Sequence, residues 1–308
     1  MEPKQFDLDA GLPNVLLVGN GILCSLAKLN DTENHRWFES VMNLSEEPLT
    51  ETKKVRLENI PYSVLATIVA STDDKKRNEA YSKEFKTLPI TDYTLLKDLV
   101  SLGFDSILTT NYTYEIENCF NPSFSSMKNK SPYVGQIARK SAGGKIDSKY
   151  LLHTFNQFEN SPPIWHIHGE ERRKSSIVLT HDEYARLIYK LIEENKMNKN
   201  KYVEYKKEVR YKSWLDYFLM SNLYIVGLGM DFSEFDLWWI LNRRLRENQQ
   251  TGKITYFKSI YDNSNISNAL SQLGICVEEF GIEAYDRNSY YIEFYREVTN
   301  YIKNDMKS

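Results

Sequence analysis

The chain has 308 residues, with 39 Lys and Arg against 42 Asp and Glu and a formal net charge of −3. Its length allows one large domain or two small ones. The balanced charge argues against direct nucleic-acid binding, because phosphate-binding surfaces need a basic excess. The sequence has no run of 18 apolar residues, so no membrane span is predicted. A polar N-terminus and three cysteines without a Cys-x-x-Cys pair predict a cytoplasmic protein.

The first predicted element is a strand at residues 15–18, followed by Gly19-Asn20-Gly21 and a helical pattern to residue 29. A continuous apolar run of this length is typical of a strand buried on both faces of a parallel sheet. Glycines at such a corner let the backbone approach a pyrophosphate, and the helix N-terminus offers free N–H groups. The third glycine of the dinucleotide-binding motif is missing, so a tight turn without a ligand remains the alternative.

Residues 31–101 contain no convincing strand and predict a helical insertion that lies over the sheet as a lid or pocket wall. We expect Trp37 and Phe38 in its core. The expected helices are residues 35–44, 61–71, 74–85 and 91–102, with candidate caps at Asn30 or Asp31, Thr72 and Thr91.

Three small polar residues, Thr109, Thr110 and Asn111, follow a predicted strand at residues 106–108. Polar side chains at the carboxyl end of a parallel strand lie where α/β sheets bind ligands. The Asn111 amide cannot titrate, but it offers donors and an acceptor that could position a ribose or a water. Alternatively, Asn111 caps a helix predicted at residues 112–119.

A loop-rich insertion is predicted at residues 120–161, which contain Asn-Pro, Ser-Pro and Gly-Gly pairs. Its basic residues are expected on a solvated surface, with binding of an anionic ligand or partner as the alternative. They are Lys128, Lys130, Arg139, Lys140 and Lys145.

Two histidines, His166 and His168, occur in the extended segment 163–169 and are expected to point the same way. They could bind a metal, but a third and a fourth ligand are not evident, so we predict none. His168, which precedes Gly169, suits a proton acceptor near neutral pH. His166 better fits a core histidine satisfied by a neighbouring carbonyl.

A short strand is predicted at residues 176–180, followed by a long helix from His181 with a capping box formed by Thr180 and Glu183. Residues 190–212 are dense in charge and predict a helical extension, which could be a partner-binding arm or only a solvated surface.

A second corner repeats the pattern of the first: a strand at residues 223–226, Gly227-Leu-Gly229, and a helix at residues 235–246 capped by Asp231 or Ser233. The two corners could hold the two halves of a dinucleotide. Strands at 254–257 and 275–278 and helices at 266–272 and 289–303 complete the pattern. We therefore predict an α/β protein with a Rossmann-like, doubly wound, mostly parallel sheet and a helical insertion.

Five motifs in this order resemble the SIR2-like family, and within it the bacterial antiphage-defence branch rather than the classical zinc-containing sirtuins. They are Gly19-Asn-Gly21, Thr109-Thr-Asn-Tyr112, His166-Ile-His-Gly169, Val178-Leu-Thr180 with Tyr184, and Gly227-Leu-Gly229 with Asp231. The resemblance implies one SIR2-like domain over residues 1–308 that binds NAD as a substrate and cleaves the bond between nicotinamide and ribose.

The resemblance also assigns roles to individual residues. Asn111 would position the ribose and the attacking water, and His168 would act as the base on a ribose hydroxyl. The cofactor-binding residues would be Gly19, Asn20, Gly21, Thr110, Gly227, Gly229 and Asp231. The chain departs from the family at Thr113, where Asp is common, and at Met230, where Ser is common; its three cysteines cannot build a four-cysteine zinc ribbon.

The expected function is an NAD+ glycohydrolase that acts in antiphage defence by NAD+ depletion, without a metal. A trigger is expected: homo-oligomerisation, a sensor protein encoded alongside, or a nucleotide activator. The alternatives are an NAD- or nucleotide-binding regulatory module without catalysis, and an NAD-dependent protein deacylase.

Overall fold

The computed structural model describes residues 5–7, 11–30, 32, 37–126, 135–136, 150–204, 208–246, 252–262, 264–282 and 286–307. The candidate cap Asp31 and the basic residues predicted at positions 128–145 lie outside these ranges, so the predictions made for them stay predictions.

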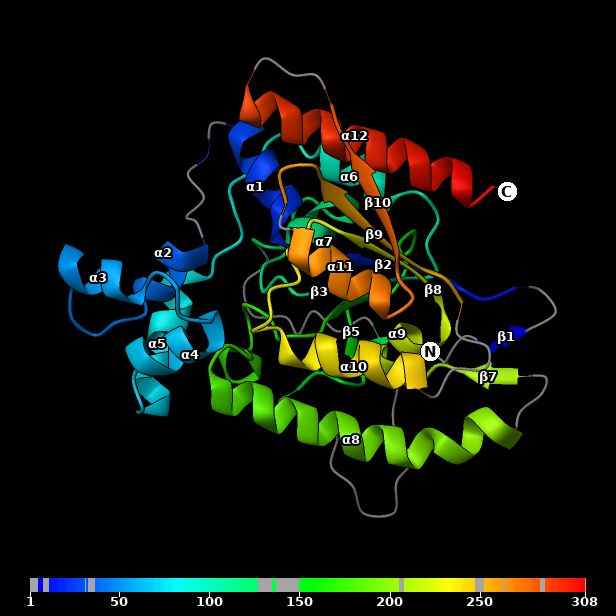
Figure 1. Ribbon diagram of the computed structural model, residues 1–308, viewed down its shortest axis with the longest axis horizontal. Coiled ribbons are helices and arrows are strands. Elements are labelled where there is room, and N and C mark those ends of the chain that lie inside the picture. The colour runs from blue at the N-terminus through cyan, green and yellow to red at the C-terminus, as the bar shows by residue number, and fades with distance from the viewer. Residues whose placement is uncertain are drawn as a thin grey trace.

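A six-stranded, all-parallel sheet forms the centre of the molecule (Figure 1). Its order is β6-β3-β2-β8-β9-β10, which is 3-2-1-4-5-6 when these six strands are numbered along the chain. This is the Rossmann order, and the order reverses between β2 and β8. The predicted α/β class is therefore confirmed. The strands are β2 (Asn14–Val18), β3 (Ser106–Thr109), β6 (Ile164–His166), β8 (Asn222–Val226), β9 (Ile254–Ser259) and β10 (Cys276–Phe280).

The apolar runs form central strands because both faces of the sheet are covered. Successive side chains of β2 alternate between two cores: Val15 and Leu17 lie in one, Leu16 and Val18 in the other. All four are fully buried. A continuous hydrophobic run is thus required at this position.

Helices cover the two faces of the sheet as separate layers (Figure 1). The helices α1 (Asn20–Leu29), α6 (Thr94–Val100) and α12 (Arg287–Asp305) pack on one face, and α7 (Glu115–Phe120) packs against α6. The other face is covered by α8 (His181–Glu204), α9 (Trp214–Met220), α10 (Phe235–Arg246) and α11 (Ser264–Gln272). None of the helices within the described ranges is long and apolar enough to span a membrane.

The insertion forms a third core beside the sheet (Figure 1). Its helices are α2 (Trp37–Met42), α3 (Glu51–Leu57), α4 (Tyr62–Val69) and α5 (Asp74–Glu84). Helix α3, which is capped by the Thr50 hydroxyl, was not predicted from the sequence. The predicted caps Thr72 and Thr91 are wrong: α5 is capped by Asp73, and α6 begins only at Thr94.

One predicted strand, at residues 176–180, is wrong. The short 3-10 helix η2 (Lys174–Ser176) occupies its start. Beyond it, Val178 makes individual bonds instead of a ladder: its N–H donates to the His168 carbonyl at 2.9 Å, and its carbonyl accepts the Tyr112 hydroxyl at 2.9 Å. Gly169, at φ +93°, turns the chain out of the sheet after His166, so no strand ladder can continue. The helix from His181 is confirmed, and the Glu183 carboxylate accepts the Leu179 and Thr180 N–H groups.

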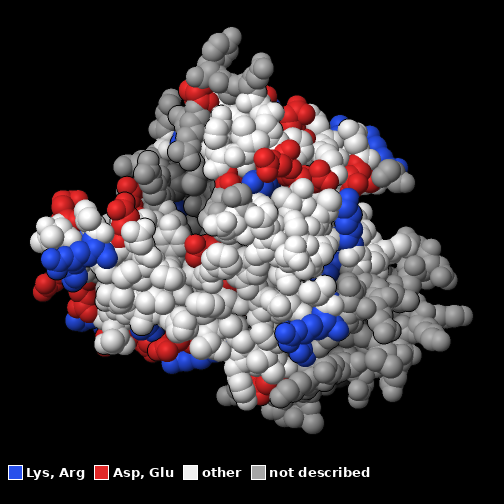
Figure 2. Space-filling view, viewed as in Figure 1, with Lys and Arg blue, Asp and Glu red and all other residues white. Residues whose placement is uncertain are grey.

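Two small antiparallel pairs complete the described structure: β1 (Gln5–Asp7) with β7 (Glu208–Arg210), and β4 (Gly135–Gln136) with β5 (Thr154–Phe155). Basic and acidic residues are interspersed on the face shown in Figure 2, and its central part is largely uncharged. The described residues form no continuous basic surface on this face.

Candidate active site

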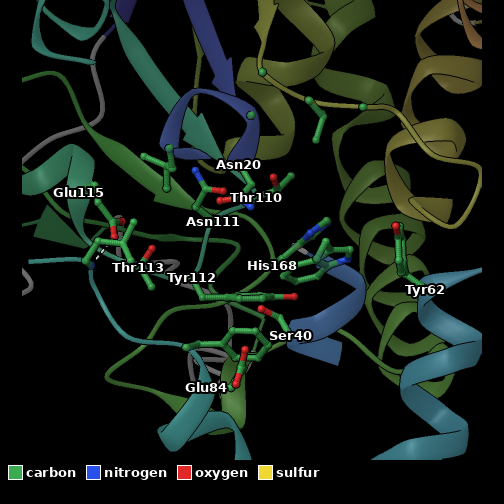
Figure 3. A pocket seen from close by; sticks show the side chains of 18 of the residues that line it. Asn20, Ser40, Tyr62, Glu84, Thr110, Asn111, Tyr112, Thr113, Glu115 and His168 are labelled. Atoms are coloured by element: carbon green, nitrogen blue, oxygen red, sulfur yellow. Dashed lines mark hydrogen bonds between the residues drawn. The ribbon is translucent and has the colours of Figure 1, made fainter. Parts of the chain in front are cut away.

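A cavity of about 540 Å³ lies at the carboxyl ends of the central strands (Figure 3). The loops after β2, β3, β6 and β8 form one wall, and the insertion, with the segment that follows α5, forms the opposite wall. This is the edge of the sheet at which the strand order reverses, where α/β proteins bind their ligands.

Most of the predicted site residues meet in this cavity. Asn111 and His168 both line it, as do Tyr184, Thr113 and Met230. Of the predicted cofactor-binding residues, the lining includes Asn20, Gly21, Thr110, Gly227, Gly229 and Asp231. Gly19 is the exception: it lies behind the lining, where its carbonyl accepts a hydrogen bond from the Asn111 amide at 3.3 Å.

The two glycine corners pack directly against each other. Gly19 N–H donates to the Val226 carbonyl at 2.9 Å, and Gly21 N–H donates to the Gly227 carbonyl at 2.7 Å. A Cβ at Gly19 would lie 2.5 Å from the Gly227 oxygen. The first corner therefore needs glycine for contact with the second corner, which is a reason that the sequence motif did not reveal. A Cβ at Gly229 would meet nothing within 4 Å.

Asn111 is held from its main chain and from its side chain. Its N–H donates to the Thr109 hydroxyl at 3.0 Å, and its Nδ2 donates to the Gly19 carbonyl at 3.3 Å. The cap alternative is wrong, because α7 begins at Glu115 with Tyr114 in the cap position. Asn111 instead links the end of β3 to the first glycine corner, with its side chain at the cavity wall (Figure 3).

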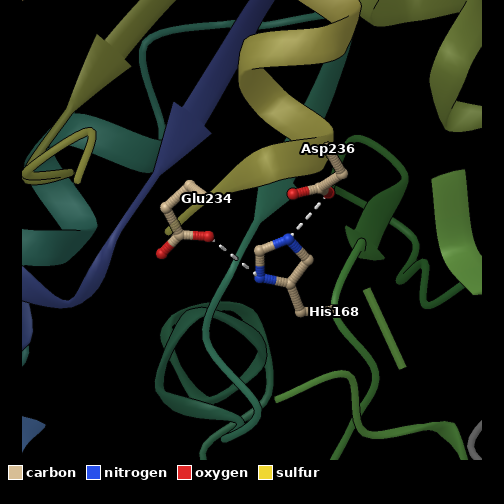
Figure 4. Close-up of side chains that lie close together, drawn as sticks. All are labelled: His168, Glu234 and Asp236. Atoms are coloured by element: carbon tan, nitrogen blue, oxygen red, sulfur yellow. Dashed lines mark hydrogen bonds and ion pairs between the residues drawn. The ribbon is translucent and has the colours of Figure 1, made fainter. Parts of the chain in front are cut away.

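The His168 imidazole is buried between two carboxylates (Figure 4). Its Nε2 lies 2.9 Å from Oδ2 of Asp236, and its Nδ1 lies 3.8 Å from Oε2 of Glu234. Burial lowers the pKa of His168, but attraction to Asp236 and Glu234 outweighs it and leaves the pKa raised. The Tyr184 hydroxyl donates to Glu234 at 3.0 Å and fixes that carboxylate.

These three residues are also the one cluster of His, Cys, Asp and Glu within the described ranges that could hold a metal ion. The two carboxylates, however, face different nitrogens of one ring (Figure 4). This is the arrangement of a histidine oriented by acids, in which one carboxylate fixes the tautomer and the second stabilises the protonated ring.

His166 takes part in a different network from His168. Its Nδ1 lies 2.6 Å from the Asn111 carbonyl, and its Nε2 lies 2.7 Å from Glu117. It is buried and does not line the cavity. The expectation that a neighbouring carbonyl satisfies His166 is therefore confirmed, and the structure adds a buried ion pair to it.

Several carboxylates of the site were not predicted. Glu115 is fully buried at the cavity wall, its Oε1 accepts the Leu88 N–H at 2.8 Å, and its Oε2 has no hydrogen-bond partner in the described structure. Burial raises the pKa of Glu115 to about 7. Glu234 and Asp236 could have been found as acidic residues just after the second corner. Glu115 follows Asn111 by four residues, a weaker signal.

Aromatic side chains form the wall opposite Asn111. Trp37 packs against Phe85 and Tyr112 with ring centroids 6.0 Å away in each case, and Phe85 and Tyr112 are 4.7 Å apart. Trp37 was expected only in the core of the insertion; it packs on that core and lines the cavity too. Phe38 packs on the core as predicted.

Comparison with curated proteins finds no match to this chain. The family model described as the SIR2-like domain matches residues 105–278, more than half of the chain. The match includes Asn111, His168 and the second glycine corner, and it does not include the first corner or helices α2–α5. The chain therefore belongs to the SIR2-like domain family.

Proposed function

We propose that the protein is an NAD+ glycohydrolase that releases nicotinamide and ADP-ribose. SIR2-like domains are in general NAD-dependent enzymes. The observation that carries the proposal is the meeting of Asn111 and the acid-paired His168 in one cavity, bordered by both glycine corners.

The cavity suits the parts of NAD+. Its volume of about 540 Å³ falls in the usual range for small-molecule sites. The N-terminus of α1 has neither a side-chain cap nor an acidic residue in its first turn, so its positive end favours a pyrophosphate. The four acidic lining residues suit ribose hydroxyls and the cationic nicotinamide ring, and among the described lining residues Lys86 is the one Lys or Arg.

The reaction needs little acid catalysis, because the nicotinamide ring of NAD+ is already a cationic leaving group. When the bond between ribose C1′ and the ring nitrogen breaks, its electron pair neutralises the ring, and positive charge develops on the ribose. The enzyme must then hold the ribose, stabilise that charge and admit one water. The Asn111 amide is placed to position the ribose or the water.

His168 would take up the proton that the water or a ribose hydroxyl loses. Asp236 holds its Nε2, which leaves Nδ1 toward Glu234 and the cavity. The two carboxylates stabilise the imidazolium as it forms, and Asp236 fixes the ring orientation.

The wider role rests on the resemblance drawn from the sequence. We propose that the protein acts in antiphage defence by depleting NAD+. Since uncontrolled NAD+ loss would kill the host, a homo-oligomer, a sensor protein or a nucleotide would have to trigger the activity.

Product analysis tests the proposed activity. Pure protein is incubated with NAD+, with and without an acyl-lysine peptide, and the products are separated by chromatography. Equal amounts of nicotinamide and ADP-ribose without peptide support the proposal. Release that needs the peptide would identify a deacylase, and NAD+ binding without products would identify a regulatory module.

A further inference from the structure

The main chain of Asn111 is fixed by a residue that lies outside the cavity. The Asn111 carbonyl accepts a hydrogen bond from Nδ1 of His166 at 2.6 Å. His166 is the last residue of β6 and pairs with Thr109 across the sheet, while the Thr109 hydroxyl accepts the Asn111 N–H. The Asn111 N–H is thus bonded to β3, and the Asn111 carbonyl is bonded to the neighbouring strand β6.

The opposite side of the His166 ring is also engaged. Its Nε2 lies 2.7 Å from Oε1 of Glu117, and the Asn156 amide donates to the same oxygen at 2.9 Å. A main-chain carbonyl only accepts hydrogen bonds, and so does an ionised carboxylate. With Glu117 ionised, both ring nitrogens carry protons to satisfy the two partners, which makes the ring an imidazolium.

Other groups around the ring support the same state. Burial lowers the pKa of His166, but Glu117, Glu170 and the Asn111 carbonyl raise it to about 9. Two other neighbours do not favour protonation: the Tyr114 ring lies 5.5 Å from the His166 ring, and the Arg172 guanidinium, a like charge, lies 4.7 Å from the Tyr114 ring centre.

We propose that protonated His166 is a positioning residue, which clamps the Asn111 backbone so that the Asn111 amide meets the substrate in a fixed orientation. The expected change in kcat rests on the proposed NAD+ cleavage, whereas the hydrogen bonds of His166 and its protonation do not depend on it. Small displacements of a catalytic group cost large factors in rate, so loss of the clamp should lower kcat more than it changes KM.

Two variants separate the clamp from the ion pair. In His166→Gln, the amide reaches the place of Nε2 and keeps the bond to Glu117, but the bond to Asn111 is lost. In H166N combined with Glu117→Gln, the shorter amide reaches the place of Nδ1, and no carboxylate is left buried without a partner. We expect kcat to fall roughly 10- to 100-fold in the first variant, with KM within about threefold, and to stay within about threefold of wild type in the second.

His153 provides a matched control. It too is a buried histidine between a main-chain carbonyl, that of Lys212 at 2.9 Å, and a glutamate, Glu194 at 3.4 Å, but it lies outside the cavity. His153→Gln should lower the unfolding midpoint without lowering kcat. Equal losses of kcat in His153→Gln and His166→Gln, or in both His166 variants, would overturn the proposal.

A measurement on the wild-type ring is independent of turnover. In ¹⁵N NMR spectra, the His166 signals, identified by their absence from the His166→Gln spectrum, should show two protonated ring nitrogens at pH 7.5 and titrate near pH 9. A neutral ring at pH 7.5 would overturn the clamp, whether or not the protein releases nicotinamide. If the wild type releases none, the proposed function fails, and the NMR result alone decides the clamp.

Discussion

Replacing Gly21 by alanine tests the contact between the two glycine corners. The added Cβ would lie 2.5 Å from the Tyr295 hydroxyl oxygen, 2.9 Å from the Gly227 carbonyl oxygen and 3.1 Å from Gly227 Cα. Two of these three neighbours are backbone atoms, so a side-chain rotation cannot make enough room. The corners must move apart, which also strains the 2.7 Å bond from Gly21 N–H to the Gly227 carbonyl.

The expected cost follows from these contacts. Overpacking of a close-packed site costs about 1–3 kcal/mol, and weakening one buried backbone hydrogen bond costs about 1 kcal/mol. Gly21 lies in the first turn of α1, where alanine has a higher helix propensity than glycine. This difference offsets up to about 1 kcal/mol of the cost. We therefore expect the free energy of unfolding to fall by about 2 kcal/mol.

Gly229→Ala is the matched control. Its Cβ would meet nothing within 4 Å, so stability should change by less than about 0.5 kcal/mol. Gly229 lines the cavity, and the added methyl should instead weaken NAD+ binding. Urea denaturation followed by circular dichroism measures both stabilities. Equal destabilisation of the two variants, or none in Gly21→Ala, would refute the close contact between the two glycine corners.

Three further predictions concern the charges and the aromatic wall. Asp236→Asn removes the attraction that raises the pKa of His168, so the acidic limb of the pH–kcat profile should move to lower pH. We also expect kcat to fall roughly 10- to 100-fold. An unchanged profile would contradict the pairing of His168 with Asp236. His166 has its pKa raised to about 9, so it stabilises the fold fully below its ordinary pKa of about 6.5 and loses this stabilisation as pH rises through 9. Urea denaturation of wild type should therefore show a loss of about 3 kcal/mol between pH 6 and pH 10 that His166→Gln lacks, and equal losses would be evidence against the ion pair. Trp37→Ala removes a ring from the cavity wall and should raise the Kd for NAD+ about tenfold by calorimetry, with Trp37→Phe close to wild type; an unchanged Kd would show that the ring does not contact the ligand.

The fold was largely predictable because its central strands are buried on both faces. Such strands are continuous apolar runs, as at residues 15–18 and 223–226, and each ends at a glycine corner. The site was partly predictable for the same reason: polar residues just after these runs must lie at one edge of the sheet. Asn111 was found in this way, whereas His168 was chosen because it precedes Gly169 and can accept a proton near neutral pH.

The partners of these residues could not be predicted. Asp236 reaches His168 from a helix 68 positions further along the chain, and Glu115 depends on the chain segment that carries Leu88. The false strand at residues 176–180 has a strand-like composition, but the turn at Gly169 removes its neighbour. Tertiary contacts decided each of these features, and local patterns do not encode them.

The central claim is that Asn111 and His168 act together on NAD+ in one cavity. The most direct test is the single-turnover release of nicotinamide from NAD+ by wild type, Asn111→Ala and His168→Ala, each with NAD+ binding and folding verified. We predict stoichiometric release by the wild type and at least a hundredfold slower release by both variants. Unchanged release by a folded variant, or none by a wild type that has bound NAD+, would contradict the account.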